Sequence, residues 1–295
     1  MPGNAAEAPG RRPSSRQLLA ATIEPASSLL SPRHARRTSA PVSAPLFDHR
    51  LRALRRDRAV RSGIETFLYD RAFADCLDRL SDIRNPFARA LLAGCPNPDW
   101  ANQLPVSAVD IIDPGPLMAE RAGGRLADLE SLPFDADSFD LCISIGTLDT
   151  ANNLPLAAAA LHMVVKPGGL LLGAIAGGHS LPRLRSAMLA ADSVSGRTSA
   201  HVHPRIEAAS LASLLAGAGF AEPVVDVDRI DISYASLDRL VQDLRMMGAT
   251  NILSVRVSQP IGKEALAMAR QAFLEGADRA VERIEILHFA AWKPA

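Results

Sequence analysis

Apolar positions follow a helical period near the start of the chain and form short runs further on. The segment 47–61, FDHRLRALRRDRAVR, places Phe47, Leu51 and Leu54 at helical spacing. This spacing predicts an amphipathic helix whose arginines face outward into solvent. A second helix is predicted over 65–80, where apolar residues alternate with charged ones in the same period.

Beyond residue 86, runs with the length of buried strands alternate with helical segments. The runs at 87–93, 106–112 and 139–145 are followed by turn residues, and the helix at 154–165 ends at the turn KPGG. Such alternation requires crossover connections and indicates a parallel, doubly wound α/β sheet covered on both faces. The other predicted elements are strands at 124–129, 170–175, 224–231 and 281–292, and helices at 181–191, 208–218, 237–247 and 262–273.

The first 44 residues differ from the rest of the chain. They contain six arginines but only two acids, Glu7 and Glu24, and no sustained apolar period. A disordered basic tail is the prediction, with an organellar transit peptide or a misassigned start as alternatives. We therefore predict a domain over 45–295, with a helical cap at 45–85 and a core at 86–295 that holds an insertion near 192–275.

Composition excludes several classes of protein. Lys and Arg (32) balance Asp and Glu (32), and aromatic residues make up 4% of the chain, which argues against a nucleic-acid-binding surface. No apolar run approaches the roughly 20 residues of a transmembrane helix. The three cysteines, Cys76, Cys95 and Cys142, form no disulfide or zinc pattern, and we expect Cys95 and Cys142 to be packing residues. We predict a cytoplasmic location, or the mitochondrial matrix if the tail is a transit peptide.

Candidate chemistry lies at the ends of the predicted strands. In a doubly wound sheet, ligands bind at the carboxyl ends of the strands. Gly94 follows the first strand, and Asp113 follows the second, where a carboxylate can accept hydrogen bonds from both hydroxyls of a ribose. Asp128 follows the third strand, where a carboxylate can accept from the amine of adenine. Their order predicts a nucleoside site, although aspartate is also common in turns.

Two motifs carry a resemblance to a known family. The segment LADLESLPFDADSFDL at 126–141 and the turn KPGGLLLG at 166–173 resemble the class I S-adenosylmethionine-dependent methyltransferases. The resemblance implies a Rossmann-like, seven-stranded sheet with an antiparallel last strand, and S-adenosyl-L-methionine as the cofactor. It also implies that the cofactor contacts Ala93, Gly94, Asp113, Pro114, Asp128, Leu129 and Ser144.

Four further segments support a narrower resemblance. They are 47–59, GGHSLPRLR at 177–185, HPRIE at 203–207 and DLRMMGATN at 243–251. They resemble the methyltransferase-fold assembly factors of respiratory complex I and, in part, the malonyl-carrier-protein methyltransferases. These families imply an enzyme that modifies a protein side chain, as in a complex I subunit, or a small carboxylic acid. Arginine hydroxylation is implied as an alternative to methylation.

The loop after the first strand departs from the family pattern. Where the family has an acid and two glycines, this chain has Leu92, Pro96 and Pro98. Proline fixes φ and lacks an amide donor, whereas glycine allows close approach of the backbone. A non-catalytic assembly or scaffold protein on the same fold is therefore the second hypothesis.

Other candidate residues point to no definite chemistry. His201 and His203, with His179 upstream, lie in a segment where no paired carboxylate follows at ligand spacing, so we predict a structural or solvent-facing loop rather than a metal site. Three arginines on subfamily segments could hold a carboxylate or a partner, or simply cover helix surfaces: Arg183, Arg185 and Arg245. No catalytic residue is predicted, because methyl transfer depends mostly on alignment. The substrate and the oligomeric state stay open.

Overall fold

The structure is a computed structural model that describes residues 44–84, 86–257 and 259–295. The chain divides into Met1–Ser43 and Ala44–Ala295, and the second unit holds all the elements below. The predicted tail at 1–44 lies outside the described residues except for Ala44.

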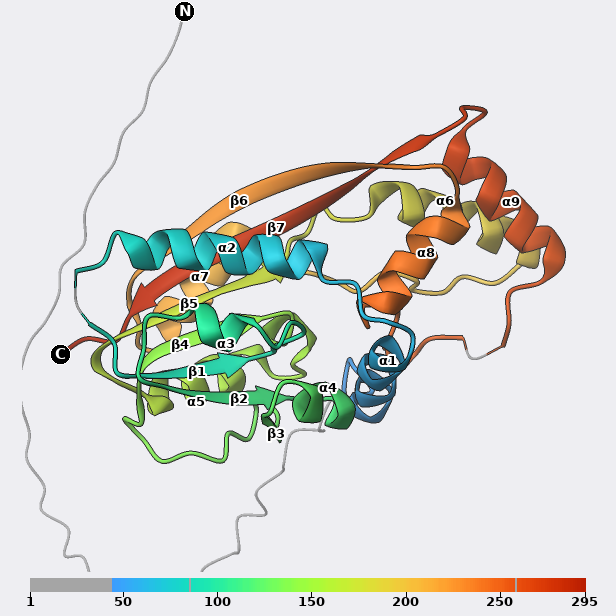
Figure 1. The fold of residues 1–295 in the computed structure, drawn as a ribbon. Helices are drawn as coiled ribbons and strands as arrows, with labels where there is room; N and C mark the ends of the chain where they lie inside the picture. Colours follow the sequence, from blue (N-terminus) through green and yellow to red (C-terminus); the bar gives the residue numbers. More distant parts are fainter. Residues whose placement is uncertain (1–43, 85, 258) are drawn as a thin grey trace, which may run out of the picture. The chain divides into compact units, whose positions relative to one another are not determined.

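A seven-stranded sheet with the order β3-β2-β1-β4-β5-β7-β6 forms the centre of the unit (Figure 1). The neighbouring strands β3, β2, β1, β4 and β5 are parallel to one another, whereas β7 is antiparallel to both β5 and β6. This arrangement confirms the predicted fold class, including the antiparallel last strand. The strands are β1 Arg89–Ala93, β2 Ala108–Asp113, β3 Arg125–Leu126, β4 Phe139–Ile145, β5 Val165–Ala176, β6 Ala221–Tyr234 and β7 Ala280–Trp292.

Helices cover both faces of the sheet because the strands are apolar on both sides. Leu92 and Ile143 belong to a core that includes side chains of α2, whereas Leu91 and Cys142 belong to a second core with α5 and α7. Neighbouring strand residues point to opposite faces, so continuous apolar runs produce two cores. The helices are α1 His49–Arg61, α2 Phe67–Ser81, α3 Trp100–Gln103, α4 Pro116–Arg121, α5 Leu154–Val164, α6 Pro182–Ser195, α7 Ala208–Gly217, α8 Leu237–Met246 and α9 Lys263–Leu274, with a 3-10 turn at Leu148–Thr150.

Three features of the predicted strands differ from the structure, two in length and one in connection. The third strand is only Arg125–Leu126, because the backbone turns at Asp128, which bridges to Ser131. The strand β5 starts at Val165, so the KPGG segment belongs to an irregular strand end rather than to a separate turn. The last two strands pair, but α8 and α9 lie between them in the sequence, so they do not form a simple hairpin.

The orientation predicted for the first helix is wrong. Arg52 and Arg56 are buried, whereas the apolar Leu54 is 53% exposed. The prediction assumed that charged side chains face water, but Arg56 meets the buried carboxylate of Asp113 and Arg52 meets the partly buried carboxylate of Asp128. The helix is therefore docked by charge rather than by an apolar stripe.

No helix in the described part of the chain is both long and apolar enough to cross a bilayer.

Gly173 of β5 tests the packing of the sheet. A Cβ at this position would lie 2.2 Å from the carbonyl oxygen of Ser144 and 2.5 Å from Cζ of Phe289. We expect Gly173→Ala to lower the free energy of unfolding by about 1–3 kcal/mol, because the added methyl group overpacks the core. Urea unfolding followed by circular dichroism measures the change.

Gly217→Ala is the matched control, because a Cβ at this end of α7 meets nothing within 4 Å. It should leave the stability unchanged or raise it by up to about 1 kcal/mol. Equal stability losses in the two variants would contradict this account of Gly173.

Candidate functional site

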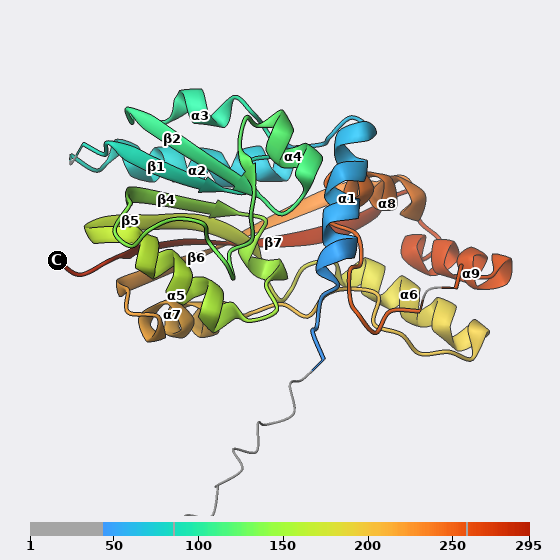
Figure 2. The same ribbon diagram turned by 90° about the horizontal axis from the view of Figure 1, so that it is seen from below.

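The first helix lies across the carboxyl ends of the parallel strands. In Figure 2 the arrows of β1, β2 and β4 point toward α1, and α4 lies between that helix and β2. Asp57 of α1 accepts a hydrogen bond at 2.9 Å from the backbone N–H of Leu117, in the first turn of α4. The helix thus covers the edge of the sheet where the sequence predicts a nucleoside site.

Arg56 and Asp113 form a buried, bidentate ion pair. The guanidinium Nε donates to Oδ1 at 2.7 Å, and Nη2 donates to Oδ2 at 2.5 Å. Asp113 is fully buried, and its Oδ1 also accepts from the N–H of Gly115 at 2.8 Å. Burial by itself lowers the pKa of Arg56, but the charge and hydrogen bonds of Asp113 outweigh it and raise this pKa above its ordinary value.

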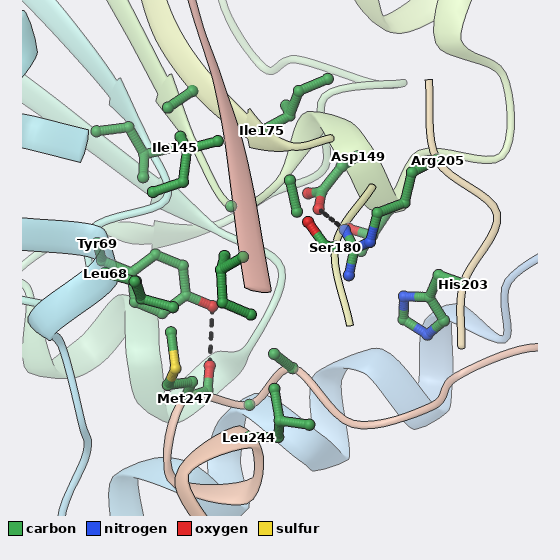
Figure 3. Close-up of a pocket in the computed structure, with 18 of the residues that line it drawn as sticks. Leu68, Tyr69, Ile145, Asp149, Ile175, Ser180, His203, Arg205, Leu244 and Met247 are labelled. Atoms are coloured by element: carbon green, nitrogen blue, oxygen red, sulfur yellow. Dashed lines mark hydrogen bonds and ion pairs between the residues drawn. The ribbon is translucent and has the colours of Figure 1, made fainter. Parts of the chain in front are cut away.

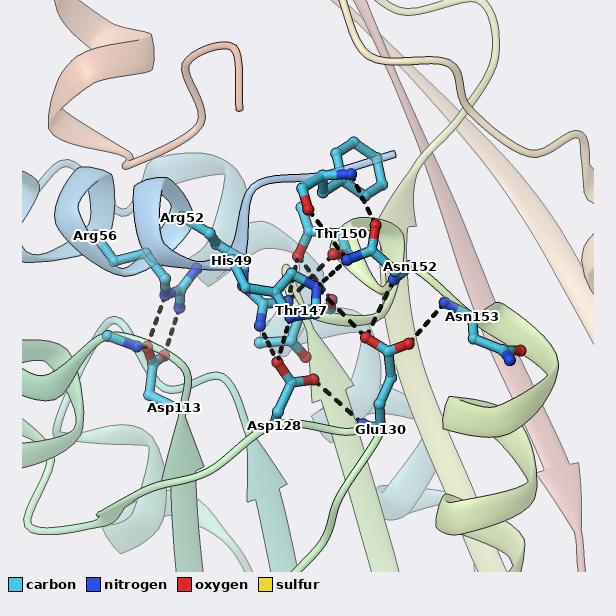
Figure 4. A network of polar contacts seen from close by, with 12 residues as sticks. His49, Arg52, Arg56, Asp113, Asp128, Glu130, Thr147, Thr150, Asn152 and Asn153 are labelled. Atoms are coloured by element: carbon cyan, nitrogen blue, oxygen red, sulfur yellow. Dashed lines mark hydrogen bonds and ion pairs between the residues drawn. The ribbon is translucent and has the colours of Figure 1, made fainter. Parts of the chain in front are cut away.

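Arg52 holds Asp128 in the same way, one helical turn earlier. Its Nη2 donates to Oδ2 of Asp128, and its Nη1 donates to the carbonyl of Thr150 at 3.2 Å. His49 lies beside this pair, with its Nδ1 3.5 Å from Oδ2 of Asp128 and its Nε2 3.4 Å from Glu130 (Figure 4). Both predicted nucleoside acids are therefore bound by arginines of α1.

Most of the residues predicted to contact the cofactor surround one small hollow. It contains about 200 Å³ of empty space and is lined by Ala93, Pro114, Asp128 and Leu129, together with Arg52, Ile112, Ala127 and Thr147. Ser144 lies at its border, since its hydroxyl is 3.2 Å from that of Thr147. Gly94 has φ of +88°, and a Cβ there would lie 2.2 Å from the carbonyl oxygen of Ile145. Only glycine fits this turn.

The proline-containing loop after β1 is tied to α2. Asp70 accepts from Nδ2 of Asn97 at 2.9 Å and from Nε1 of Trp100 at 2.8 Å. The indole of Trp100 stacks on Phe73 with ring centroids 4.5 Å apart. The thiol of Cys95 is buried and donates to the carbonyl of Asn97 at 3.2 Å. These contacts make the loop a packed corner of the fold.

A larger cavity lies on the other side of α1, at the ends of β4 and β5. It holds about 890 Å³ of empty space, part of it open to solvent, and its wall includes Leu68, Met247 and Arg205 (Figure 3). Arg52 and Arg56 also line it. Most of the lining is apolar and comes from α2, α8 and three strands: Leu68, Ala72, Ile145, Ala174, Ile175, Leu244, Met247, Ile284 and Ile286.

A few polar groups converge on this cavity. Nη1 of Arg205 lies 3.1 Å from Oδ2 of Asp149, whereas Nε of Arg205 and Oδ1 of Asp149 are buried and have no hydrogen-bond partner among the described residues. His203 accepts from the N–H of Ile252 through Nε2 at 3.0 Å, so the neutral ring carries its proton on Nδ1. An apolar cavity with a few convergent polar groups is typical of a binding site.

Comparisons with known proteins agree with the fold. Residues 93–173 match the family model described as a methyltransferase domain. The chain is 30% identical to arginine-hydroxylase NDUFAF5 of Mus musculus over 274 residues, which cover 87% of this chain and 80% of that protein. The chain belongs to the class I S-adenosylmethionine-dependent methyltransferase family. The comparisons thereby bear out the resemblance found in the sequence.

Two further known proteins are similar to this chain. It is 32% identical to a malonyl-[acyl-carrier protein] O-methyltransferase of Gallionella capsiferriformans over 171 residues, which cover 57% of each chain. The crystal structure of the YcgJ protein from Bacillus subtilis covers 76% of this chain and 98% of its own, with 14% identity and a TM-score of 0.52. The latter supports the fold alone.

The sequence analysis did not identify the side chains of α1 and of the large cavity as parts of a functional site. Arg52 and Arg56 are spaced by four residues, so they share a helix face, and this spacing was the available signal. Asp149 lies in the 3-10 turn, whereas His203 and Arg205 lie in the segment between α6 and α7, and no local pattern connects the first with the other two.

Two groups of side chains could offer ligands to a metal ion. His49, Asp128 and Glu130 form one group, and His179 with Glu207 and Glu285 forms the other. Both carboxylates of the second group are distant from His179 in the sequence, so the spacing argument could not find them. His201 pairs instead with Asp192, at 2.9 Å.

The remaining predictions concern arginines and cysteines. Arg183 pairs with Glu275 at 2.7 Å, while Arg185 and Arg245 are exposed on helix surfaces. Cys95 and Cys142 are buried, as expected for packing residues, and burial raises the pKa of both thiols.

His203 makes the stability of this protein depend on pH. Burial, and then the charge of Arg205, lower the pKa of His203 from 6.5 to about 4. The unfolded chain binds this proton more readily, so the stability contributed by the neutral ring is complete above pH 6.5 and is lost as the pH falls toward 4. We expect a loss of up to about 3 kcal/mol from this group, measured by urea unfolding from pH 7.5 to pH 4.

His203→Gln, which keeps an acceptor for the N–H of Ile252, should lack this part of the pH dependence. His201→Gln is the control and should retain it, because it leaves His203 in place. An unchanged pH profile in His203→Gln would refute the assignment.

Proposed function

We propose that the chain is an S-adenosylmethionine-dependent enzyme of the complex I assembly-factor type, which modifies an acceptor in the large cavity. The observation that carries this proposal is that the cavity adjoins the hollow beside Asp128, with Arg52 lining both spaces. Arg56, which binds Asp113, also lines the cavity. Cofactor and acceptor need adjoining sites, because transfer depends on holding donor and acceptor in line.

The donor set suits the nucleoside half of the cofactor. Asp113 would hold the ribose hydroxyls, Asp128 would hold the adenine amine, and Ala93, Pro114 and Leu129 would contact the ring. The methionine half of the cofactor would find fewer backbone hydrogen-bond donors, because Pro96 and Pro98 have no N–H to donate. When bound, the cofactor would supply a methyl group to an oxygen or nitrogen of the acceptor.

The cavity suits an acceptor with an apolar stem and a charged end. Its apolar wall would hold the stem and exclude water. A carboxylate would find donors in Arg205 and Nδ1 of His203, whereas a protein guanidinium would find the unpartnered Oδ1 of Asp149. Both acceptor classes proposed from the sequence, a protein side chain and a small carboxylic acid, therefore have a matching group.

The relatives support a role in assembly. The vertebrate proteins that match most of this chain are named as arginine-hydroxylases, and the unpartnered oxygen of Asp149 is consistent with a bound arginine. We propose a subunit of respiratory complex I as the protein partner, with arginine hydroxylation as the alternative reaction.

A scaffold without catalysis is the second candidate. Two observations favour it: the proline-containing loop is a packed corner tied to Asp70, and Arg56 and Arg52 already bind both nucleoside acids. Under this proposal the fold would present a surface to a partner, and the carboxylates would serve to anchor α1.

Calorimetric titration with S-adenosylmethionine separates the two candidates. We expect binding by the full chain, and at least about tenfold weaker binding by Asp113→Asn, because hydrogen bonds from the ribose to an ionised carboxylate are lost. Asp231→Asn is the control, since that carboxylate pairs with Arg283 on β7, away from the site; its affinity should equal that of the unmodified chain.

Absence of binding at millimolar ligand, both in the chain and in its Arg52→Gln/Arg56→Gln variant, would rule out the enzyme proposal. The scaffold would then be the better account. Binding that Asp113→Asn leaves unchanged would place the cofactor elsewhere.

A further inference from the structure

We propose that α1 is an internal competitor of the cofactor: Arg56 and Arg52 occupy the nucleoside acids, so that the cofactor binds only when the helix withdraws. This inference rests on the proposed function, because the cofactor is the ligand with which the helix competes.

Asp113 has no oxygen available to a ribose in this conformation. Both oxygens accept from Arg56, Oδ1 accepts also from Gly115, and the side chain is fully buried. The backbones are also in close contact, because a Cβ on Gly115 would lie 2.7 Å from Cβ of Arg56. A ribose therefore cannot enter between Asp113 and α1 without moving the helix.

Arg52 closes the adenine end of the same site. It donates to Oδ2 of Asp128, whose Oδ1 accepts from the backbone N–H of Glu130 at 3.2 Å. The hollow beside Asp128 keeps only about 200 Å³ of empty space, with Arg52 in its wall. Within residues 44–84, 86–257 and 259–295, the buried Nε of Arg52 has no hydrogen-bond partner, so the hydrogen-bonding capacity of this side chain is incompletely satisfied there.

The way α1 is held makes its withdrawal feasible. Its buried residues are Arg52, Arg56, Asp57 and Ala59, and its apolar anchor is limited to the first turn, where Leu51 packs against Phe47, Ile252 and Leu253. A nucleoside supplies hydroxyl and amine donors to the same carboxylates, while the released guanidinium groups regain water. The ligand thereby replaces the interactions that dock the helix, which is the condition for a shift between two conformations.

Repulsion between arginines of α1 and neighbouring arginines also weakens the docking of this helix. Burial, and then Arg256 and Arg245, lower the pKa of Arg55, and burial, Arg55 and Arg245 lower the pKa of Arg58. The Nε atoms of both side chains are buried without a hydrogen-bond partner. Withdrawal separates these arginines from Arg245 and Arg256.

Titration of the full chain with S-adenosylhomocysteine tests the competition. Arg52→Gln/Arg56→Gln removes the competing guanidinium groups, and we expect it to bind at least about tenfold more tightly than the unmodified chain. Arg50→Gln/Arg61→Gln is the matched control, because it removes two charges from exposed positions of the same helix. Its affinity should equal that of the unmodified chain.

Hydrogen exchange gives a second readout on the unmodified chain. Saturating S-adenosylhomocysteine should speed the exchange of backbone amides in 49–61 and leave those of β4 unchanged. If the double variant does not fold, Arg52→Gln serves instead, because Asp128 is partly exposed and tolerates the loss; it too should bind more tightly.

Three results would overturn the inference. Binding to the unmodified chain with equal or greater protection of 49–61 would show that α1 stays docked over the cofactor, and the enzyme proposal would survive. Equal affinity of the folded arginine variants and the unmodified chain would show that the arginines do not compete. Absence of binding in every variant would reject both the competition and the enzyme proposal.

Discussion

The buried ion pair between Arg56 and Asp113 determines how the N-terminal helix meets the sheet. A guanidinium removed from water needs a carboxylate in bidentate contact, and removing one partner of such a pair costs about 3–5 kcal/mol. This requirement turns the charged side of α1 inward and leaves Leu54 in solvent. The same orientation brings Asp57 to the first turn of α4, so one ion pair organises the carboxyl edge of the sheet.

The helix also borders two spaces through one side chain. Arg52 lines both the small hollow beside Asp128 and the large apolar cavity at the ends of β4 and β5. A ligand in either space therefore contacts the same side chain. Since packed interiors respond to a displaced side chain by discrete rearrangement, occupation of the hollow and of the cavity should be coupled through α1.

The loop after β1 shows how a shared fold can carry a changed site. Leu92 packs in the apolar core, and Asp70 of α2 holds the loop through Asn97 and Trp100. The loop contributes to packing and lacks the amide donors of a glycine-rich turn. The adjoining cavity holds other donors, the guanidinium of Arg205 and the Nδ1 proton of His203, so polar recognition has a place beyond this loop.

The sequence by itself determined the alternating strands and helices and the positions of Asp113 at a strand end and Asp128 just after one, whereas the antiparallel last strand was implied only by the resemblance to the family. The first two features depend on apolar periodicity and turn residues, which are local. It could not determine the direction of Arg52 and Arg56, because their carboxylate partners are 76 and 57 residues away. Nor could it bring Asp149 to Arg205, or Glu207 and Glu285 to His179. Only the tertiary structure decides which charges are buried together, because ion pairing depends on distance in space. The helical period of a sequence shows which positions are apolar, and it does not show which charged partner a side chain will meet.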